Sequence, residues 1–307
     1  MSTYLEPGWI ERFAELWERL GPETRQAIDG LLGDDWSYEG KRIMDFGCGA
    51  GRTLKHFMPL AQSVSAEVWG ADIDAASVDL LRQTVCPPMH VIKSEYLPPL
   101  PLPEASFDLI WSISVFTHLT DNLLPWLREL HRLLAPGGLL IATYMGRWTS
   151  ELLAGEPWDE DRVGMNVLRH NHPAADGAPL TMISDWWLRQ HWGRAFEVIR
   201  IEPNIHNQSW ALLRKRDVEV SVAALDVPSD DPRELVALRH NLVQAQREIE
   251  AVQRRAAEAL EAQRAAAEQA VAQARQEFEA SLSWALTRPL RAGRRAARAY
   301  RARRRRA

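Results

Sequence analysis

The chain has 307 residues, of which 46% are hydrophobic, so it is long and apolar enough to bury a substantial core. Its two cysteines exclude a disulfide scaffold and favour a reducing compartment, so we expect a cytoplasmic location. The sequence has no apolar run long enough to span a membrane, and its first residues lack the features of a signal peptide. The net charge of −4 conceals an asymmetry, because residues 284–307 hold ten arginines and no acid.

Residues 1–34 are predicted to form two helices. Aromatic residues and leucines recur at helical spacing over 9–20, which predicts an amphipathic helix that packs on the main domain. A second helix is expected over 22–32, ending at a Gly-Asp-Asp turn.

Residues 35–216 alternate between short β-branched or apolar runs and helical patterns. This alternation is typical of β-α-β units, so we predict an α/β fold with a doubly wound, mainly parallel, seven-stranded sheet. A turn is expected over 204–207, between the last two strands. The expected strands are 41–45, 67–72, 89–93, 107–113, 138–144, 196–201 and 209–214, and the expected helices are 51–60, 75–84, 121–135 and 184–192.

The character of the sequence changes after residue 216. Residues 217–233 contain two prolines and several acids, which suits a linker. Residues 234–280 lack glycine and proline and predict one long helix. Two interpretations stay open for this helix, a coiled coil that forms homo-oligomers or a lone solvated helix held by charge pairs. Apolar residues at a 3-4 spacing, followed by a stutter and an alanine-rich half, favour the coiled coil: Leu235, Leu238, Leu242, Ala245, Ile249, Val252 and Ala256.

The strongest chemical signal is a glycine loop that follows the first predicted strand. The strand ends at Asp45, and Gly47, Gly49 and Gly51 follow at alternate positions. Glycine lets the backbone turn tightly and approach a ligand, and the amides of the turn and of the next helix are expected to point at that ligand. Asp72 ends the next strand, where a carboxylate accepts hydrogen bonds from a ribose diol.

In these motifs the sequence resembles the class I S-adenosylmethionine-dependent methyltransferases. The resemblance spans about residues 35–215 and includes the Ser-Phe-Asp-Leu-Ile-Trp-Ser run at 106–112 and the Leu-Leu-Ala-Pro-Gly-Gly run at 133–138. It implies S-adenosylmethionine as cofactor. The family often carries a Gly-Asp pair after the third strand, whereas this chain has Ser94 and Glu95 there. The cofactor-binding residues that the resemblance implies are Asp45, Gly47, Gly49, Gly51, Asp72, Ile73, Glu95 and Ser112.

Three histidines are candidates for catalysis, and no metal site is predicted. His118 follows the fourth strand, where it acts as a general base, lines the cofactor site or orders the loop; all three roles stay open. His170 and His172 lie in an insert over 146–183, and their i, i+2 spacing does not favour a shared metal. Four tryptophans in or just after this insert suit either a sugar-binding cleft or a compact core: Trp148, Trp158, Trp186 and Trp187.

Residues 281–307 form a predicted cationic amphipathic tail. The segment Ser-Trp-Ala-Leu-Thr-Arg-Pro-Leu-Arg at 283–291 resembles segments that end many bacterial enzymes of cell-surface polysaccharide assembly. Arginines next to a few apolar side chains favour peripheral contact with an anionic membrane. Binding to nucleic acid is the less favoured interpretation because no nucleic-acid-binding fold accompanies the arginines, and a solvated tail is the third.

Together, these patterns lead us to expect an enzyme that O-methylates a sugar hydroxyl of a cell-surface glycan or its lipid-linked precursor. It is expected to assemble through the coiled coil and to contact the inner face of the cell membrane. The alternatives are a methyltransferase for a small molecule or RNA, and a non-catalytic scaffold for glycan-assembly enzymes.

Overall fold

The computed structural model describes residues 9–63, 65–151, 158–168, 179–280 and 286–304. The chain divides into two units, residues 1–244 and residues 245–307. The first unit contains all the strands, and the second consists of helical segments.

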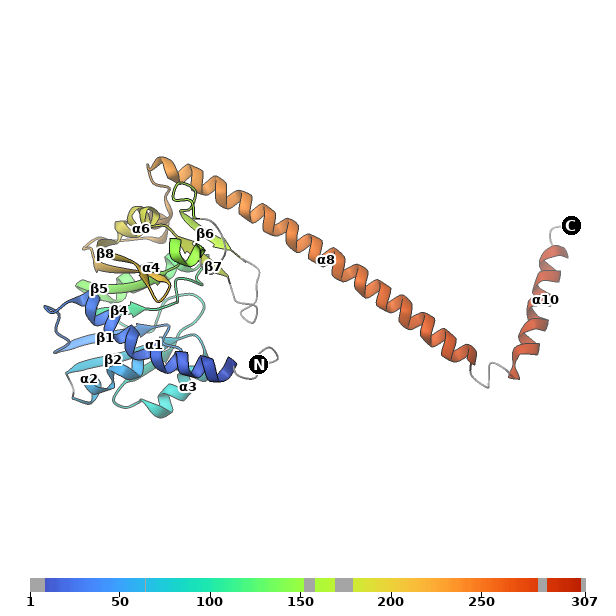
Figure 1. The fold of residues 1–307 in the computed structure, drawn as a ribbon, viewed down its shortest axis with the longest axis horizontal. Coiled ribbons are helices and arrows are strands. Elements are labelled where there is room, and N and C mark those ends of the chain that lie inside the picture. Colours follow the sequence, from blue (N-terminus) through green and yellow to red (C-terminus); the bar gives the residue numbers. More distant parts are fainter. Residues whose placement is uncertain (1–8, 64, 152–157, 169–178, 281–285, 305–307) are drawn as a thin grey trace. The chain divides into compact units, whose positions relative to one another are not determined.

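The first unit is built on a seven-stranded sheet with helices on both faces (Figure 1). The strand order is β3-β2-β1-β4-β5-β9-β8, and only the pairings made by β9 are antiparallel. This confirms the predicted doubly wound, mainly parallel sheet. The strands are β1 (Lys41–Phe46), β2 (Ala66–Asp72), β3 (His90–Lys93), β4 (Phe107–Ser112), β5 (Leu134–Tyr144), β8 (Phe196–Ile205) and β9 (Gln208–Lys215).

Most of the predicted helices are confirmed. Two regions predicted as helical differ, and so does the predicted turn between the last two strands. Residues 9–32 form one continuous helix that includes Pro22, so the prediction of two N-terminal helices is wrong. The predicted helix over 51–60 is replaced by a 3₁₀ turn and a five-residue helix. The turn before β9 is only two residues long. The helices of this unit are α1 (Trp9–Leu32), η1 (Leu54–Phe57), α2 (Met58–Gln62), α3 (Ala75–Thr84), α4 (Leu123–Leu133), α5 (Arg147–Thr149), α6 (Asp185–His191), η4 (Trp192–Arg194) and α7 (Val222–Asp226).

Alternate residues of each central strand serve two separate hydrophobic cores. Met44 faces a core completed by α4 and α6, whereas its neighbour Ile43 faces a core completed by α1, α2 and α3. This is the alternation that a strand covered by helices on both faces requires. The packing holds the carboxyl ends of β1, β2 and β4 side by side, which positions the loops that follow them.

The insert after β5 contains a short antiparallel pair, β6 (Met165–Leu168) and β7 (Leu180–Ile183), that the sequence patterns did not reveal. The Thr181 N–H donates to the Thr117 carbonyl (2.8 Å), so β7 lies against the loop that follows β4. At four residues each, these strands are too short for a periodic pattern to be read in sequence.

Residues 217–233 are not a free linker. Leu225, on α7, is fully buried, and its carbonyl lies 2.9 Å from His191 Nδ1 on α6. Arg194 donates to the carbonyls of Ala224 (2.9 Å) and Val227 (2.6 Å). The segment therefore packs against the sheet domain and brings the start of the next helix onto it.

A single helix, α8 (Pro232–Ala280), follows, as predicted, and α10 (Arg288–Arg304) comes after it. The first turns of α8 belong to the first unit and the rest belongs to the second. Among the residues that the structure describes, no helix combines the length and apolarity needed to cross a bilayer.

Candidate functional site

The loop after β1 requires glycine for two reasons. Gly47 and Gly51 adopt φ angles of +83° and +85°, in the region that L-residues rarely enter. A Cβ on Gly47 would lie 2.1 Å from Val115 Cγ2, and a Cβ on Gly51 would lie 2.5 Å from Leu81 Cδ2. The loop therefore packs closely between the post-β4 loop and α3.

The amides of this loop are used within the protein, contrary to our expectation that they point at a ligand. The Gly47 and Cys48 N–H groups donate to the Ala71 carbonyl (2.7 and 3.1 Å), and the Gly51 N–H donates to the Cys48 carbonyl (2.9 Å). The Gly49 N–H donates to Asp72 Oδ2 (2.6 Å). These bonds join the ends of β1 and β2, so the main contribution of the loop is to hold Asp72 in place.

Asp72 keeps acceptor capacity for a ligand. Its Oδ2 accepts from Gly49, and its Oδ1 accepts from the Asp74 N–H (2.8 Å). Each carboxylate oxygen accepts more than one hydrogen bond, so a diol can still bind on the exposed side of this half-buried group.

A cavity of about 470 Å³ lies beside Asp72 at the carboxyl edge of the sheet. It contains five of the predicted site residues: Gly47, Asp72, Ile73, Glu95 and His118. The other lining residues are Phe46, Ser94, Tyr96, Ser114, Val115, Leu119, Asn122 and Trp126.

The other predicted residues do not line this cavity. Ser112 is fully buried within β4, and Ser114, two residues later, takes the position at the cavity wall. Gly49 and Gly51 belong to the supporting loop, and Asp45 is buried at the end of β1. The predicted strand over 107–113 agrees with β4, but the prediction that Ser112 binds the cofactor is not supported by the cavity, which Ser114 lines instead.

Asp45 is a buried acid near the end of β1. Burial raises the pKa of its carboxyl to about 7, and the charge of Asp72 adds to the rise, whereas the Trp111 indole and the Arg52 guanidinium oppose it. The Asp45 carboxyl is therefore harder to ionise than a solvated aspartate, and a further positive charge nearby would lower its pKa.

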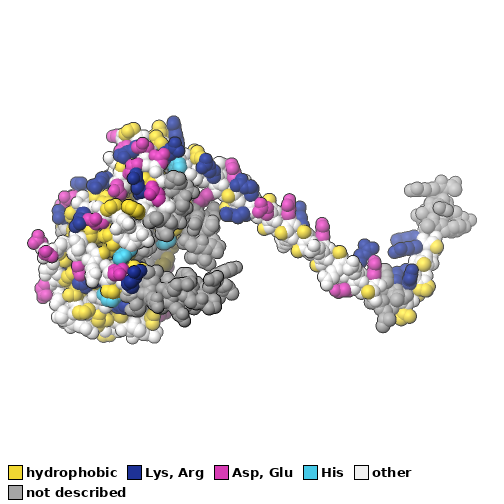
Figure 2. All heavy atoms as spheres, viewed as in Figure 1, with side chains coloured by type: hydrophobic (Ala, Val, Ile, Leu, Met, Phe, Trp, Pro, Cys, Tyr) yellow, Lys and Arg dark blue, Asp and Glu magenta, His cyan; other side chains and the backbone are white. Residues whose placement is uncertain are grey.

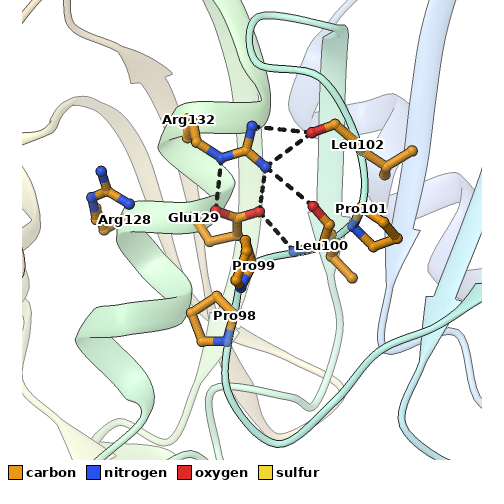
Figure 3. Close-up of a pocket in the computed structure, with 8 residues that line it drawn as sticks. All are labelled: Pro98, Pro99, Leu100, Pro101, Leu102, Arg128, Glu129 and Arg132. Carbon is orange, nitrogen blue, oxygen red and sulfur yellow. Dashed lines mark hydrogen bonds and ion pairs between the residues drawn. The ribbon is translucent and has the colours of Figure 1, made fainter.

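Glu95 lies at the rim of the cavity. It is exposed and pairs with Lys93 (2.9 Å). The proline-rich segment that follows it is held against α4 by Arg132 and Glu129 (Figure 3). Arg132 donates to the carbonyl of Leu102 (3.1 Å), and the Leu100 N–H donates to the buried Glu129 carboxylate (2.9 Å). The prolines thus belong to a fixed segment that positions residues 94–96.

Tyr96 is a site residue that the sequence analysis did not single out. Its hydroxyl donates to Asp121 Oδ1 (2.7 Å), and its carbonyl accepts from Asn122 Nδ2 and Trp126 Nε1 (3.1 Å each). These bonds join the post-β3 segment to the start of α4 across the cavity wall. The partners are 25 to 30 residues apart in sequence, so no local pattern indicated them.

The hydrogen bond made by His118 determines its tautomer. Its Nδ1 lies 2.9 Å from the Pro179 carbonyl, which can only accept, so Nδ1 carries a hydrogen. The neutral ring then has its lone pair on Nε2. His118 lines the cavity, and this arrangement gives the site a proton acceptor held by one fixed contact.

Ser114 is held in a left-handed backbone conformation, with φ of +61°. Its N–H donates to Thr143 Oγ1 (2.7 Å), and its Oγ accepts from Gln208 Nε2 (2.9 Å). Such a conformation in a residue other than glycine is unfavourable and is concentrated at functional sites. β5 and β9 together therefore determine where this hydroxyl lies.

The other histidine candidates, His170 and His172, lie outside the described residues. Within the described part of the chain, no group of three or more potential ligands is placed to hold a metal. Trp186 and Trp187 are buried in the core, whereas Trp148 is 43% exposed. The core interpretation therefore holds for the two tryptophans of α6.

Comparison with known proteins finds similarity over the part of the chain that forms this site. Residues 44–142 match the family model described as a methyltransferase domain. The chain is 29% identical over 161 residues to methyltransferase GfsG of Streptomyces halstedii, covering 48% of this chain and 51% of the relative. It is 34% identical over 134 residues to a ubiquinone biosynthesis O-methyltransferase of Ruegeria pomeroyi, covering 42% and 52%.

Two further matches are a curated relative named for a tRNA substrate and a solved structure. A tRNA N(3)-cytidine methyltransferase of Gallus gallus is 29% identical, with 43% of this chain and 37% of the relative covered. A solved S-adenosylmethionine-dependent methyltransferase from Methanosarcina mazei is 16% identical with a TM-score of 0.46, covering 62% of this chain and 98% of that one. The chain spans about half or less of the length of these three curated relatives.

The residues around the cavity fit S-adenosylmethionine, the cofactor of this domain. The cavity volume lies in the usual range for small-molecule sites, about 300 to 1,000 Å³. Asp72 presents acceptors for a ribose diol, and Ile73, which is 54% exposed, offers an apolar surface for a base. Residues 44–142 of this chain thus match the methyltransferase-domain family, and the cavity at the carboxyl edge of the sheet fits the cofactor of that domain.

Proposed function

We propose that this protein transfers the methyl group of S-adenosylmethionine to a hydroxyl oxygen. The observation that carries the proposal is the placement of Asp72 and His118 on one cavity. The first is suited to hold the cofactor and the second to accept a proton. A scaffold without catalysis has no need for a histidine on the wall of a cavity that also holds Asp72.

The proposed chemistry needs little more than positioning and one base. Bound S-adenosylmethionine would supply a methyl group from its sulfonium: the oxygen–methyl bond would form in line as the sulfur–methyl bond breaks, and S-adenosylhomocysteine would leave with the electron pair. Asp72 binds the ribose, and the Ser114 backbone, fixed by Thr143, shapes the wall beyond β4. His118 Nε2 takes the hydroxyl proton as the new oxygen–carbon bond forms. Holding donor and acceptor in line provides much of the rate enhancement in such reactions.

Replacing His118 with asparagine tests the base. The asparagine amide can retain a donor to the Pro179 carbonyl but has no basic nitrogen at the position of Nε2. We expect turnover to fall about 100-fold or more, while S-adenosylmethionine affinity stays within threefold. Labelled methyl transfer measures the first quantity and calorimetry the second. Full turnover by the variant contradicts the role as base; a matched loss of cofactor affinity assigns His118 to cofactor binding instead.

For the acceptor, we propose a sugar hydroxyl of a cell-surface glycan or its lipid-linked precursor. The support is the resemblance of residues 283–291 to segments of polysaccharide-assembly enzymes, together with the exposed indole of Trp148, since indoles stack on sugar faces. The names of the curated relatives include a tRNA and a ubiquinone-pathway methyltransferase, so RNA and small molecules stay as alternatives. Labelled transfer to an envelope glycan extract, compared with RNA and small-metabolite extracts, distinguishes the three.

We also propose that α10 brings the enzyme to an anionic membrane. Six of the eight arginines of this helix lie along one side, because they recur every three or four residues with one adjacent pair, Arg294 and Arg295. Leu286 and Leu290 are 79% and 72% exposed and lie at the start of this region, where dark blue and yellow side chains occur together (Figure 2). Arginines with adjacent apolar side chains suit a lipid surface better than a nucleic acid, which would contact the arginines only through its phosphates. The six are Arg288, Arg291, Arg294, Arg295, Arg298 and Arg301.

Vesicle flotation of the full chain tests this contact. The change is Arg294→Gln, Arg295→Gln and Arg298→Gln together. Each arginine near an anionic surface contributes about 1 kcal/mol, so we expect binding to phosphatidylglycerol vesicles to fall on the order of 100-fold. A matched triple variant on α8 (Arg254→Gln, Arg255→Gln and Arg264→Gln) should bind like the wild type.

Two results would count against the membrane proposal. One is equal flotation with neutral and anionic vesicles. The other is displacement of the protein from anionic vesicles by a low concentration of a short RNA, which would favour nucleic acid as the partner.

A further inference from the structure

In the part of the chain that the structure describes, the first turns of α8 contact the sheet domain through one face. Ala237 is 2% exposed, and Glu234 is buried beside it. Asn241 Nδ2 donates to the Met165 carbonyl on β6. These three residues recur at spacings of three and four, so they form a single stripe along the first turns of the helix.

A second stripe of the same helix carries apolar side chains that the domain leaves open. Leu235, Leu238 and Leu242 are 57%, 47% and 72% exposed, although they lie in the same turns as the buried stripe. The stripe continues through Ile249 and Val252 at an unbroken 3-4 spacing, and both are exposed. Hydrophobic side chains recur among charged ones along α8 (Figure 2). The continuous spacing is that of a coiled-coil seam.

We propose that this seam, residues 235–256, pairs with the same seam of a second copy of the chain in a parallel, in-register coiled coil. The spacing favours another helix with the same repeat, because each apolar side chain then enters a gap between four residues of its partner. A second copy provides that repeat without any other protein. The domain contact does not compete, since it uses the other stripe.

The distribution of side-chain size favours the parallel arrangement. Leucine, isoleucine and valine are concentrated in residues 235–252, whereas alanine dominates residues 256–280. A parallel pair places the large side chains of one copy against those of the other. A fully overlapped antiparallel pair would place them against alanines and leave gaps in the packing. The flanking pairs in a parallel arrangement, such as Glu248 with Gln253, bring no like charges together.

Sedimentation of the full chain, with Leu238→Glu and Leu242→Glu together, tests the seam. We expect the wild type to sediment as a dimer and this variant as a monomer. The matched control is Val236→Glu with Val243→Glu, because these valines are exposed on α8 but lie off the seam. The control should remain dimeric. Unchanged far-ultraviolet circular dichroism and unchanged S-adenosylmethionine binding would show that each variant is folded.

Three outcomes would overturn the proposal: a monomeric wild type, a dimer that survives both seam substitutions, and a dimer that the control pair also dissociates. A monomeric wild type would mean that the seam is either solvated or covered by a different protein.

The orientation has its own test, oxidation of an Ala256→Cys chain in a Cys86→Ser background. A parallel, in-register pair should form an intermolecular disulfide within the native dimer, and an antiparallel pair should not.

Discussion

Replacing Asp72 with alanine is expected to lower the affinity for S-adenosylmethionine about 100-fold or more. The carboxylate is proposed to accept hydrogen bonds from the ribose diol, and bonds to a charged group contribute about 1.5 to 3 kcal/mol each. It also accepts the N–H groups of Gly49 (2.6 Å) and Asp74 (2.8 Å), so the substitution loosens the glycine loop as well. Isothermal titration calorimetry on the purified chain measures the loss.

Two further measurements separate the direct contact from the loop. Asp72→Asn keeps one carbonyl oxygen, so its loss should be smaller than that of alanine. An analogue of S-adenosylhomocysteine without ribose hydroxyls should bind the wild type weakly, whereas the asparagine variant should discriminate little between the analogue and its parent. Asp79→Ala, an exposed acid on α3, is the matched control and should bind normally. Affinity of Asp72→Ala within threefold of the wild type would refute the assignment of Asp72 to the cofactor.

The second large effect is expected at the buried pair between His191 and Glu234. His191 Nε2 lies 2.9 Å from Glu234 Oε2, and Nδ1 lies 2.9 Å from the Leu225 carbonyl. Both residues are nearly inaccessible, and Ser229 donates to the same carboxylate oxygen (2.8 Å). The pair thus joins α6, α7 and the first turn of α8. Breaking a buried pair leaves its remaining member without compensation, which costs about 3 to 5 kcal/mol.

A double-mutant cycle in urea measures this interaction. His191→Leu and Glu234→Met should each lower the free energy of unfolding by several kcal/mol, roughly 3 to 5 for the more damaging of the two. The double variant should lose clearly less than the sum, because an apolar pair leaves no buried charge. The exposed pair of Arg214 and Glu197 (3.0 Å) is the control, and Glu197→Gln should cost less than about 1 kcal/mol. Additive losses at His191 and Glu234 would show that the two side chains do not interact.

The parts of the fold that the sequence predicted well are those in which local pattern and tertiary packing agree. β1 is an example, because its consecutive residues Ile43 and Met44 face opposite sides of the sheet and are both apolar, as a strand covered on both faces demands. The prediction failed where a local signal conflicted with packing. The pattern predicts two helices over 9–20 and 22–32, yet the chain forms one helix through Pro22, and Ile28 and Leu31 bury it against the sheet. Pro228 and the nearby acids suggested a linker, yet Leu225 is fully buried.

By itself, the sequence determined the glycine loop, the acid after β2 and the succession of strands and helices along the chain, which suffice to recognise the cofactor domain. Those features are local, since each depends on residues close together in the chain and on the backbone freedom of glycine. Only the tertiary structure decided that Ser114 rather than Ser112 faces the cavity, and that Tyr96 joins Asp121 across it. It also showed that the loop amides are used within the protein. These facts depend on contacts between residues distant in sequence.

The charge asymmetry and the long helix show the same division. Ten arginines at residues 284–307 and a 3-4 apolar spacing from residue 235 can be read directly from the sequence. Whether a face of α8 is available depends on which face the domain already uses. The structure decides this point, because the domain covers Ala237 and leaves Leu238 and Leu242 exposed. Periodicity identifies the faces of a helix, whereas packing alone determines which face remains open to a partner.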